Sequence, residues 1–342
     1  MKNRRYDSIS GLRSFSAIGI VLMHVLTNGN YRVSGILFDR LIPSFTDLVF
    51  LFMMISSFSM CCGYYDKIMN CKITPVEFYS KRLRKVWPFF ALLTVMDLVI
   101  SPSMEAVYEG FANLTLCFGL LPNANISVIG VGWTLGMIFV FYMLFPFFCY
   151  LISDKKRAWF SFCIALVFHY LCNVYFFDAA HVAEGYTYRS NIVYCAVYFL
   201  AGGLVFLYRT ELGSIARKYG WCVLICLAAL VIMALFRGHS TPAMLAMYSL
   251  ALVYTIGRET DEGLLNNKLT RFLSDISLEI YLCHMVMYRI LEKLLCDAVF
   301  QGGALHYFFV CMLTILGAVL ISVCVRWSIA KVEQLCKIQT RT

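Results

Sequence analysis

The sequence predicts an all-α integral membrane protein, a bundle of about ten transmembrane helices forming one domain over residues 1–342. Of these 342 residues, 61% are hydrophobic and 14% are charged, about half the charged share of an ordinary soluble domain. The mean hydropathy is +0.74. Apolar runs of membrane-spanning length recur from end to end, and at about 20 residues per span they leave no room for a sizeable further domain. These observations exclude a soluble enzyme, a disulfide scaffold and a disordered chain.

The first apolar run extends from Ile9 to about Leu26. It lacks the small-residue cleavage site of a signal peptide, so we expect it to be retained as the first span. Residues 110–122 are apolar but too few to cross alone, which predicts a short re-entrant or interfacial helix. The ten predicted spans are residues 9–27, 44–63, 86–101, 130–152, 158–177, 191–208, 219–236, 241–257, 273–295 and 305–326.

The basic residues predict the orientation of the chain. An even number of spans puts both termini on one side, and the alternating segments then hold 22 Lys and Arg on the inner side against four on the outer side. Positive residues gather in cytoplasmic loops, so we expect both termini in the cytoplasm. Much of the net charge of +9 is explained in this way, and nucleic acid is not expected as a partner.

Two ionisable residues lie inside the first span. Such a side chain at bilayer depth costs on the order of 3 kcal/mol on insertion scales, so it is a candidate for function. Arg13 and His24 are 11 residues apart, which places both on one helix face, about 16 Å apart along the axis. Taken alone, Arg13 could snorkel to the interface and His24 could form a structural interhelical hydrogen bond. Their shared face favours a cavity lined by both.

The ninth span carries a polar face of its own. Such a face in a membrane helix must contact protein or water. One interpretation is helix–helix packing, and the other is that His284 and the tyrosines line the same cavity as His24. The residues of this face follow each other at helical spacing: Ser277, Tyr281, His284, Tyr288 and Glu292.

Four cations occur within five residues between the second and third spans: Lys81, Arg82, Arg84 and Lys85. Such a cluster is commonly an ordinary cytoplasmic flank. The alternative is a phosphate site, because guanidinium and ammonium groups both bind phosphate. The sequence has no metal-ligand cluster and no Gly-rich phosphate loop, so we expect no metal and no permanently bound cofactor. Gly202 and Gly203 are expected to permit close helix packing.

Five short motifs occur in order over residues 7–284 and together resemble acyltransferase family 3, a family of bacterial membrane proteins. They are Asp7 to Arg13 followed by His24, similar to Asp-Gly-Leu-Arg…His; Phe52 to Phe58, similar to Phe-Phe-x-x-Ser-Gly-Phe; Tyr79 to Pro88, similar to Lys-Arg-x-x-Arg-x-x-Pro; Trp133 to Pro146, similar to Trp-Ser-Leu…Phe-Tyr…Pro; and Ser277 to His284, similar to Ser-x-x-x-Tyr-Leu-x-His.

The chain departs from the family pattern at three positions. Ile138 stands where many members carry a glutamate, and Lys85 stands where an arginine is common. The aspartate that often precedes the Phe-Phe pair is absent at Phe50, with Asp47 one turn earlier. A role for the glutamate therefore cannot be transferred to this chain.

The resemblance implies a ten-helix enzyme of the bacterial plasma membrane. It would move an acyl group, commonly acetyl, from cytosolic acyl-CoA to a hydroxyl of an extracytoplasmic glycan or a related small acceptor. A transporter or flippase and an inactive scaffold are the alternatives. The oligomeric state, including a homodimer, stays open.

The residues expected to serve this reaction follow from the motifs above. Transfer would proceed directly or through an acyl-histidine. The expected catalytic residues are His24, Arg13 and His284; those holding coenzyme A are Arg13, Lys81, Arg82, Arg84 and Lys85; those lining the acceptor cavity are Trp133, Ser277, Tyr281 and Tyr288.

Overall fold

The computed structural model describes residues 6–121, 129–178, 180–182, 188–259, 261–295 and 302–339. Across these ranges the regular structure is helical, with one isolated bridge between Gly263 and Asn266 and no named strand. The predicted all-α fold is confirmed. Six helices of the described chain are long and apolar enough to cross a membrane, or seven if α9 (Ile192–Leu207) and α10 (Arg209–Lys218), bent by 77°, form one span. The chain is therefore a multi-pass membrane protein, and the number of ten spans stays a prediction.

Each predicted span contains a helix. Four of these helices do not meet the criteria of length and composition on their own, because α9 and α12 have only 16 and 17 residues and α5 and α14 carry several charged side chains. Besides α9, the helices that correspond to the predicted spans are α1 (Ile9–Asn28), α3 (Leu48–Met60), α5 (Pro75–Ile100), α7 (Trp133–Leu151), α8 (Lys155–Leu171), α11 (Gly220–Arg237), α12 (Thr241–Gly257), α14 (Ser277–Leu295) and α15 (Ala304–Gln339).

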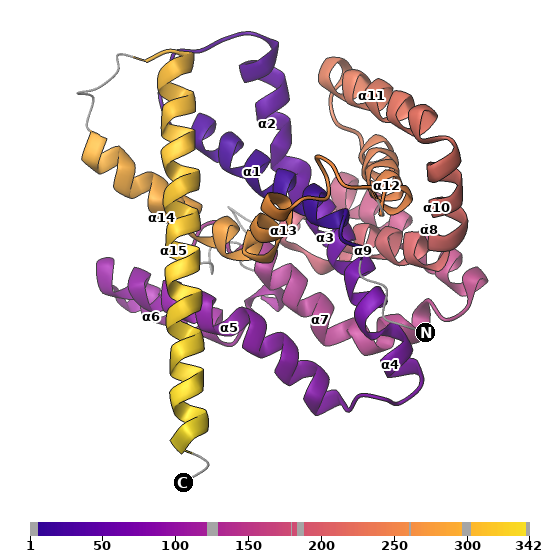
Figure 1. The fold of residues 1–342 in the computed structure, drawn as a ribbon, viewed down its shortest axis with the longest axis horizontal. Helices are drawn as coiled ribbons and strands as arrows, with labels where there is room; N and C mark the ends of the chain where they lie inside the picture. The colour runs from indigo at the N-terminus through magenta and orange to yellow at the C-terminus, as the bar shows by residue number, and fades with distance from the viewer. Residues whose placement is uncertain are drawn as a thin grey trace.

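Helix α1 runs through the middle of the molecule (Figure 1), in contact with α3, α12, α14, α15 and the short helix α13 (Lys268–Asp275). Small polar residues hold its first turns in place. The Ser14 hydroxyl donates to the carbonyl of Thr270 at 2.7 Å, and the backbone N–H of Gly11 donates to the carbonyl of Leu265 at 3.0 Å. A side chain at Gly11 would collide with the Leu265 backbone. The chain before α14 therefore fixes the end of α1 that carries Arg13.

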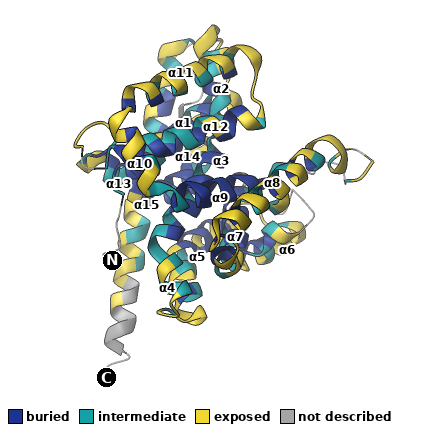
Figure 2. Cartoon of the chain, turned by 90° about the vertical axis from the view of Figure 1, so that its right-hand side faces the viewer, coloured by how far each residue is buried: buried dark blue, intermediate teal, exposed yellow. Residues whose placement is uncertain are grey.

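Two glycines of α9 allow the closest helix contacts of the core. A Cβ on Gly202 would meet the carbonyl oxygen of Met54 on α3, and one on Gly203 would lie 2.7 Å from the ring of Phe148 on α7. This confirms the packing role predicted for both glycines. Helix α9 is dark blue in Figure 2, whereas α11 is mostly yellow, as expected of a helix at the periphery that faces lipid.

Helix α5 begins with a capping box. The Thr74 hydroxyl accepts from the N–H of Glu77 at 3.2 Å, the Glu77 carboxylate accepts from the N–H of Thr74 at 3.2 Å, and Pro75 occupies the first turn. Helix α6 (Met104–Leu114) folds back along α5, where Trp87 Nε1 donates to the carbonyl of Leu114 at 2.8 Å. The predicted short helix thus exists, but it begins and ends earlier than residues 110–122, of which 122 lies outside the described residues.

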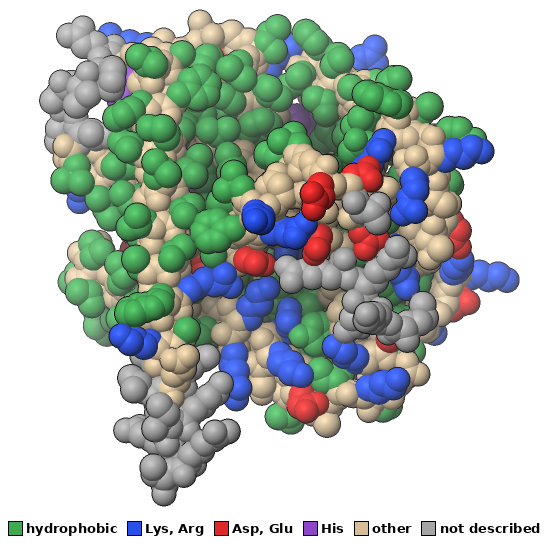
Figure 3. Space-filling model, viewed as in Figure 1, with side chains coloured by type: hydrophobic (Ala, Val, Ile, Leu, Met, Phe, Trp, Pro, Cys, Tyr) green, Lys and Arg blue, Asp and Glu red, His purple; other side chains and the backbone are tan. Residues whose placement is uncertain are grey.

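The two kinds of surface separate on the face in Figure 3. Hydrophobic side chains cover the part over α2 (Ile42–Ser44), α11 and the upper half of α15, while Lys, Arg, Asp and Glu gather over the lower right. Some residues of the basic-loop argument lie outside the described residues: Lys2, Arg4, Arg5 and Arg341.

Candidate active site

A cavity of about 290 Å³ lies between α1, α3, α5, α7 and the start of α14. Arg13 enters it from α1, and Arg82 and Lys85 enter from α5. A second cavity, of about 360 Å³, is lined by Arg13 and Lys85 as well, and it adds Tyr6 and Gly63. The two cavities share these two cations together with Ser59, Ser274 and Asp275, so they adjoin, and the pair of cavities is called the path below.

Aromatic and hydroxyl groups orient the guanidinium groups of the path. Arg13 Nη2 donates to Ser59 Oγ at 3.1 Å. Arg82 Nη2 donates to the phenol oxygen of Tyr64 at 2.6 Å, and the guanidinium carbon lies 4.7 Å from the Tyr64 ring centroid and 5.8 Å from that of Tyr142. Arg82 Nε is buried and has no hydrogen-bond partner among the described residues. A buried donor of this kind costs free energy unless a ligand or water satisfies it, and together with the neighbouring cations Arg13 and Lys85 it favours an anion site.

Two carboxylates, Asp275 and Glu279, line the same cavity. The Glu279 side chain is only 8% exposed, and its Oε1 accepts from Arg326 Nε of α15 at 3.0 Å. This ion pair offsets the charge of Glu279. Because Arg13, Arg82 and Lys85 face the remaining carboxylate, the path is electropositive on balance, which suits a polyanionic ligand.

His24 of α1 and His284 of α14 form a hydrogen-bonded pair. His24 Nδ1 lies 2.9 Å from His284 Nε2, and the ring centroids are 5.0 Å apart. His284 Nδ1 lies 2.7 Å from the carbonyl oxygen of Tyr281, which can only accept. His284 therefore carries its proton on Nδ1 when neutral, and its Nε2 accepts from His24 Nδ1. The neutral His24 is left with a lone pair on Nε2, as a general base requires.

Tyr281 lies at the inner end of the cavity, one helical turn before His284. Its phenol hydroxyl is 2.9 Å from the carbonyl oxygen of Val131 and 2.8 Å from Thr134 Oγ1, and its ring centroid is 6.0 Å from that of His284. Neither His24 nor His284 is among the residues that line the two adjoining cavities. The histidine pair thus lies behind Tyr281.

The shared face of Arg13 and His24 on α1 does not line one continuous cavity. Ala17 and Ile20 occupy that face between them, and their exposed fractions are 2% and 0%. The expected cavity therefore extends from Arg13 to Tyr281, and packed side chains separate it from His24.

The acyltransferase domain model of acyltransferase family 3 matches residues 6–323, nearly the whole chain. The chain belongs to acyltransferase family 3. No match was found among curated proteins or among solved structures. The family assignment supports a membrane acyltransferase and thereby favours an enzyme over a transporter.

Ile138 of this acyltransferase lines the cavity and is 9% exposed, so an apolar side chain stands where many members carry a glutamate. The carboxylates among the residues that line the cavity are those of Asp275 and Glu279.

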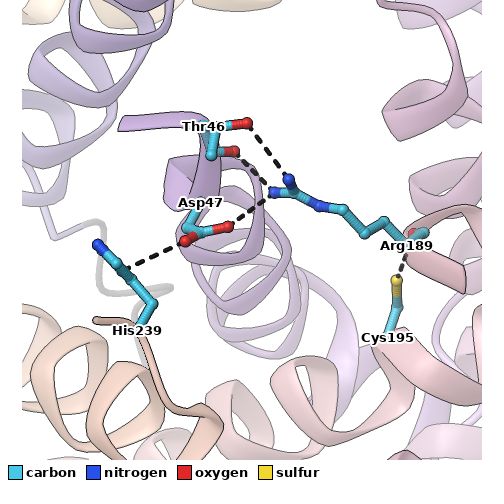
Figure 4. Close-up of polar contacts among 5 residues, drawn as sticks. All are labelled: Thr46, Asp47, Arg189, Cys195 and His239. Atoms are coloured by element: carbon cyan, nitrogen blue, oxygen red, sulfur yellow. Dashed lines mark hydrogen bonds and ion pairs between the residues drawn. The ribbon is translucent and has the colours of Figure 1, made fainter. Parts of the chain in front are cut away.

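Asp47, one turn before Phe50, where the family aspartate is absent, belongs to a separate ion-pair cluster (Figure 4). Its Oδ1 accepts from Arg189 Nη2 at 2.8 Å, and its Oδ2 lies 3.2 Å from His239 Nδ1. Arg189 also donates to the carbonyl of Thr46 at 3.0 Å. Asp47 immediately precedes α3, whereas the cavity residue Ser59 lies at the other end of that helix. The cluster therefore joins three chain segments at the end of α3 remote from the cavity.

Of the residues predicted to form the site of this acyltransferase, two groups are assembled. Arg13, Arg82, Lys85, Ser277 and Tyr281 line the cavity, and His24 contacts His284. The remaining four line neither of the two cavities. Lys81 and Arg84 are exposed, Trp133 is half-buried at the start of α7, and Tyr288 is buried and hydrogen-bonded to Tyr31: these assignments stay predictions.

Sequence reasoning missed several lining residues. Ser59, Tyr64 and Tyr142 contact the two arginines. Ser59 and Tyr64 carry no distinct sequence signal, whereas Tyr142 is the tyrosine of the motif from Trp133 to Pro146. Glu279 did carry one, because an ionisable residue inside a predicted span is a candidate by the same rule that selected Arg13.

Proposed function

We propose that this acyltransferase moves an acyl group, acetyl first among the candidates, from cytosolic acyl-CoA to a hydroxyl of an extracytoplasmic glycan or a related acceptor. The observation that carries the proposal is that α1 bears both a cavity-lining cation, Arg13, and the histidine of a polarised pair, His24. One helix then joins an anion-binding path to a general base.

The donor would enter by the path that begins at Tyr6 and Gly63. Its phosphates would pair with Arg13, Lys85 and Arg82. The buried Nε of Arg82, which has no hydrogen-bond partner among the described residues, would donate to a phosphate oxygen. Guanidinium groups bind phosphate oxygens bidentately, and the ammonium group of Lys85 adds a point charge. The pantetheine arm would extend inward along Ser59 and Ser277, with the thioester leading toward Tyr281.

In direct transfer, His24 Nε2 would take the proton of the acceptor hydroxyl while the hydroxyl oxygen attacks the thioester carbonyl carbon. As the tetrahedral intermediate collapses, the C–S bond breaks, and the thiolate of coenzyme A takes the proton back from His24. His284 would hold the His24 ring, and its Nε2 would accept from Nδ1 in both protonation states.

The same atom serves the covalent route. His24 Nε2 would attack the thioester carbonyl, form a C–N bond and release the thiolate. The acceptor oxygen would then attack the acyl carbon, the C–N bond would break, and the hydroxyl proton would pass to the thiolate of coenzyme A. Both routes require the lone pair on Nε2, so both are lost with the imidazole. Trapping the acyl-enzyme by rapid quench and mass spectrometry separates them.

The proposal is tested by incubating purified protein in proteoliposomes with acetyl-CoA and extracted surface glycan. We expect release of coenzyme A together with glycan-bound acetyl groups, both lost in His24→Ala. Transport of acetyl-CoA or glycan without release of coenzyme A would instead show a transporter. Comparing the glycans of wild-type and deletion strains by NMR then identifies the acceptor.

A further inference from the structure

We propose that Tyr281 is a gate between the donor cavity and the histidine pair, and that it must turn aside before an acyl group can reach His24. This inference deepens the proposed function and rests on it for the identity of the cargo. The closed gate itself is a property of the chain that can be measured without any acyl transfer.

The first observation is where the cavity ends. Phe52, Thr134, Leu135 and Tyr281 line the cavity, and Tyr281, which is 5% exposed, is the lining residue whose ring lies against that of His284. The Phe52 ring centroid is 6.2 Å from that of Tyr281, so the two rings close this end together.

The second observation is that the face of α1 offers no open route around Tyr281. The helix face from Arg13 to His24 is filled by Ala17 and Ile20, both buried. Because the Tyr281 ring also borders His284, a rotation of its side chain would join the cavity to the pair. Backbone movement of α1 would instead break the contacts of Ser14 and Gly11 with the chain before α14.

The third observation is a latch. The Tyr281 phenol bonds to the Val131 carbonyl and to Thr134, which belong to the beginning of α7 and the turn before it. A phenol has one proton, so it donates to Val131 when the Thr134 hydroxyl donates to it. Turning Tyr281 breaks both bonds. A closed latch would keep water on the acceptor side away from the thioester in the cavity, which would prevent wasteful hydrolysis.

The experiment measures access to residue 24 from the cavity side. His24→Cys is placed in the full-length chain, inverted membrane vesicles expose the cytoplasmic face, and a membrane-impermeant anionic methanethiosulfonate, whose charge suits the electropositive path, is added. Labelling is quantified by mass spectrometry of the peptide containing residue 24, so the other cysteines do not interfere. The rate is compared with Tyr281 intact, with Tyr281→Phe and with Thr134→Val.

Tyr281→Phe keeps the ring and removes both latch bonds, so the labelling rate should rise by about two- to tenfold per lost bond. Thr134→Val leaves the bond to Val131 and should give a smaller rise. Tyr198→Phe is the matched control, because it removes the hydroxyl of a buried tyrosine that has no hydrogen-bond partner in the described part of the chain. Its rate should equal that of the parent.

Equal rates for Tyr281→Phe and Tyr198→Phe would overturn the gate. Fast labelling with Tyr281 intact would also overturn it, since the pair would then be open to the cavity. Acetyl-CoA is added in a second arm, and it should slow labelling of the Tyr281→Phe protein by filling the cavity. A rise with Tyr281→Phe that acetyl-CoA does not affect would support the gate and contradict the proposed donor.

Discussion

His24 and His284 are 260 residues apart in the chain, and their ring nitrogens Nδ1 and Nε2 lie 2.9 Å apart. The carbonyl of Tyr281 holds the other nitrogen of His284 at 2.7 Å. A chain of hydrogen bonds thus runs from a backbone carbonyl through one imidazole to a second imidazole. In the proposed mechanism, this order makes His24 the reacting residue and His284 its positioning partner.

Replacing His24 should remove acyl transfer. We expect His24→Ala to lower turnover by roughly 10²–10⁴-fold, the range of general acid–base catalysis, while the protein still elutes as a monodisperse species on size exclusion. His284→Phe should cost less, because His24 Nε2 survives but loses its fixed orientation. Coenzyme A release is the assay for both variants.

The two histidine variants also test the assignment of roles. A larger loss in His284→Phe than in His24→Ala would reverse the roles of the pair. If either variant loses the monodisperse peak, His24→Asn and His284→Gln, which keep polar side chains in place, are assayed in its stead.

The cavity predicts that the four cations of residues 81–85 differ in donor binding. Arg82→Gln and Lys85→Gln should each raise the Michaelis constant for acetyl-CoA by about tenfold, corresponding to a charge-assisted hydrogen bond worth about 1.5 kcal/mol or more. Lys81→Gln and Arg84→Gln should have smaller effects, because these side chains lie outside the two cavities. Equal effects at all four positions would indicate a diffuse electrostatic contribution and contradict a specific phosphate site.

The cluster around Asp47 should stabilise the fold without serving the reaction. Asp47→Asn weakens contacts to Arg189 and His239, whose side chains are 23% and 25% exposed. We expect a loss of about 1–3 kcal/mol in the free energy of unfolding, typical of hydrogen bonds to charged groups. Thermal unfolding in detergent measures it. An unchanged midpoint would show that the ion pairs are offset by solvation.

The contact of α3 with α9 depends on the absence of a side chain at residue 202. Gly202→Val would force its side chain against the Met54 carbonyl, and overpacking of this kind costs about 1–3 kcal/mol. Gly263→Ala serves as a control, since a Cβ there meets nothing within 4 Å. Similar thermal midpoints for the two variants would refute the close approach.

Local periodicity accounts for much of what the sequence predicted. The spacing of Arg13 and His24 follows from helical geometry, as does the polar face that contains Ser277, Tyr281 and His284, and both patterns are present in α1 and α14. The polar face of α14 is compatible with helix packing or with a site shared by His24 and His284, and the contact between the two rings favours a shared site.

The rest depends on long-range packing that no local pattern encodes. Asp47 contacts Arg189 and His239 from segments far along the chain, and nothing near Asp47 in sequence indicates either partner. The break between cavity and histidine pair was also hidden, because Ala17 and Ile20 could equally well have faced an opening. Glu279 differs from these residues, because its place inside a predicted span marks it as a candidate from the sequence alone.

The most direct test of the account follows a radiolabelled acetyl group from acetyl-CoA, added at the cytoplasmic face of inverted vesicles, to glycan enclosed in the lumen. The account predicts label on the lumenal glycan in the wild type, little in Arg82→Gln at low donor concentration, and none in His24→Ala at any concentration. Label on the glycan at the wild-type rate in His24→Ala would contradict the central claim.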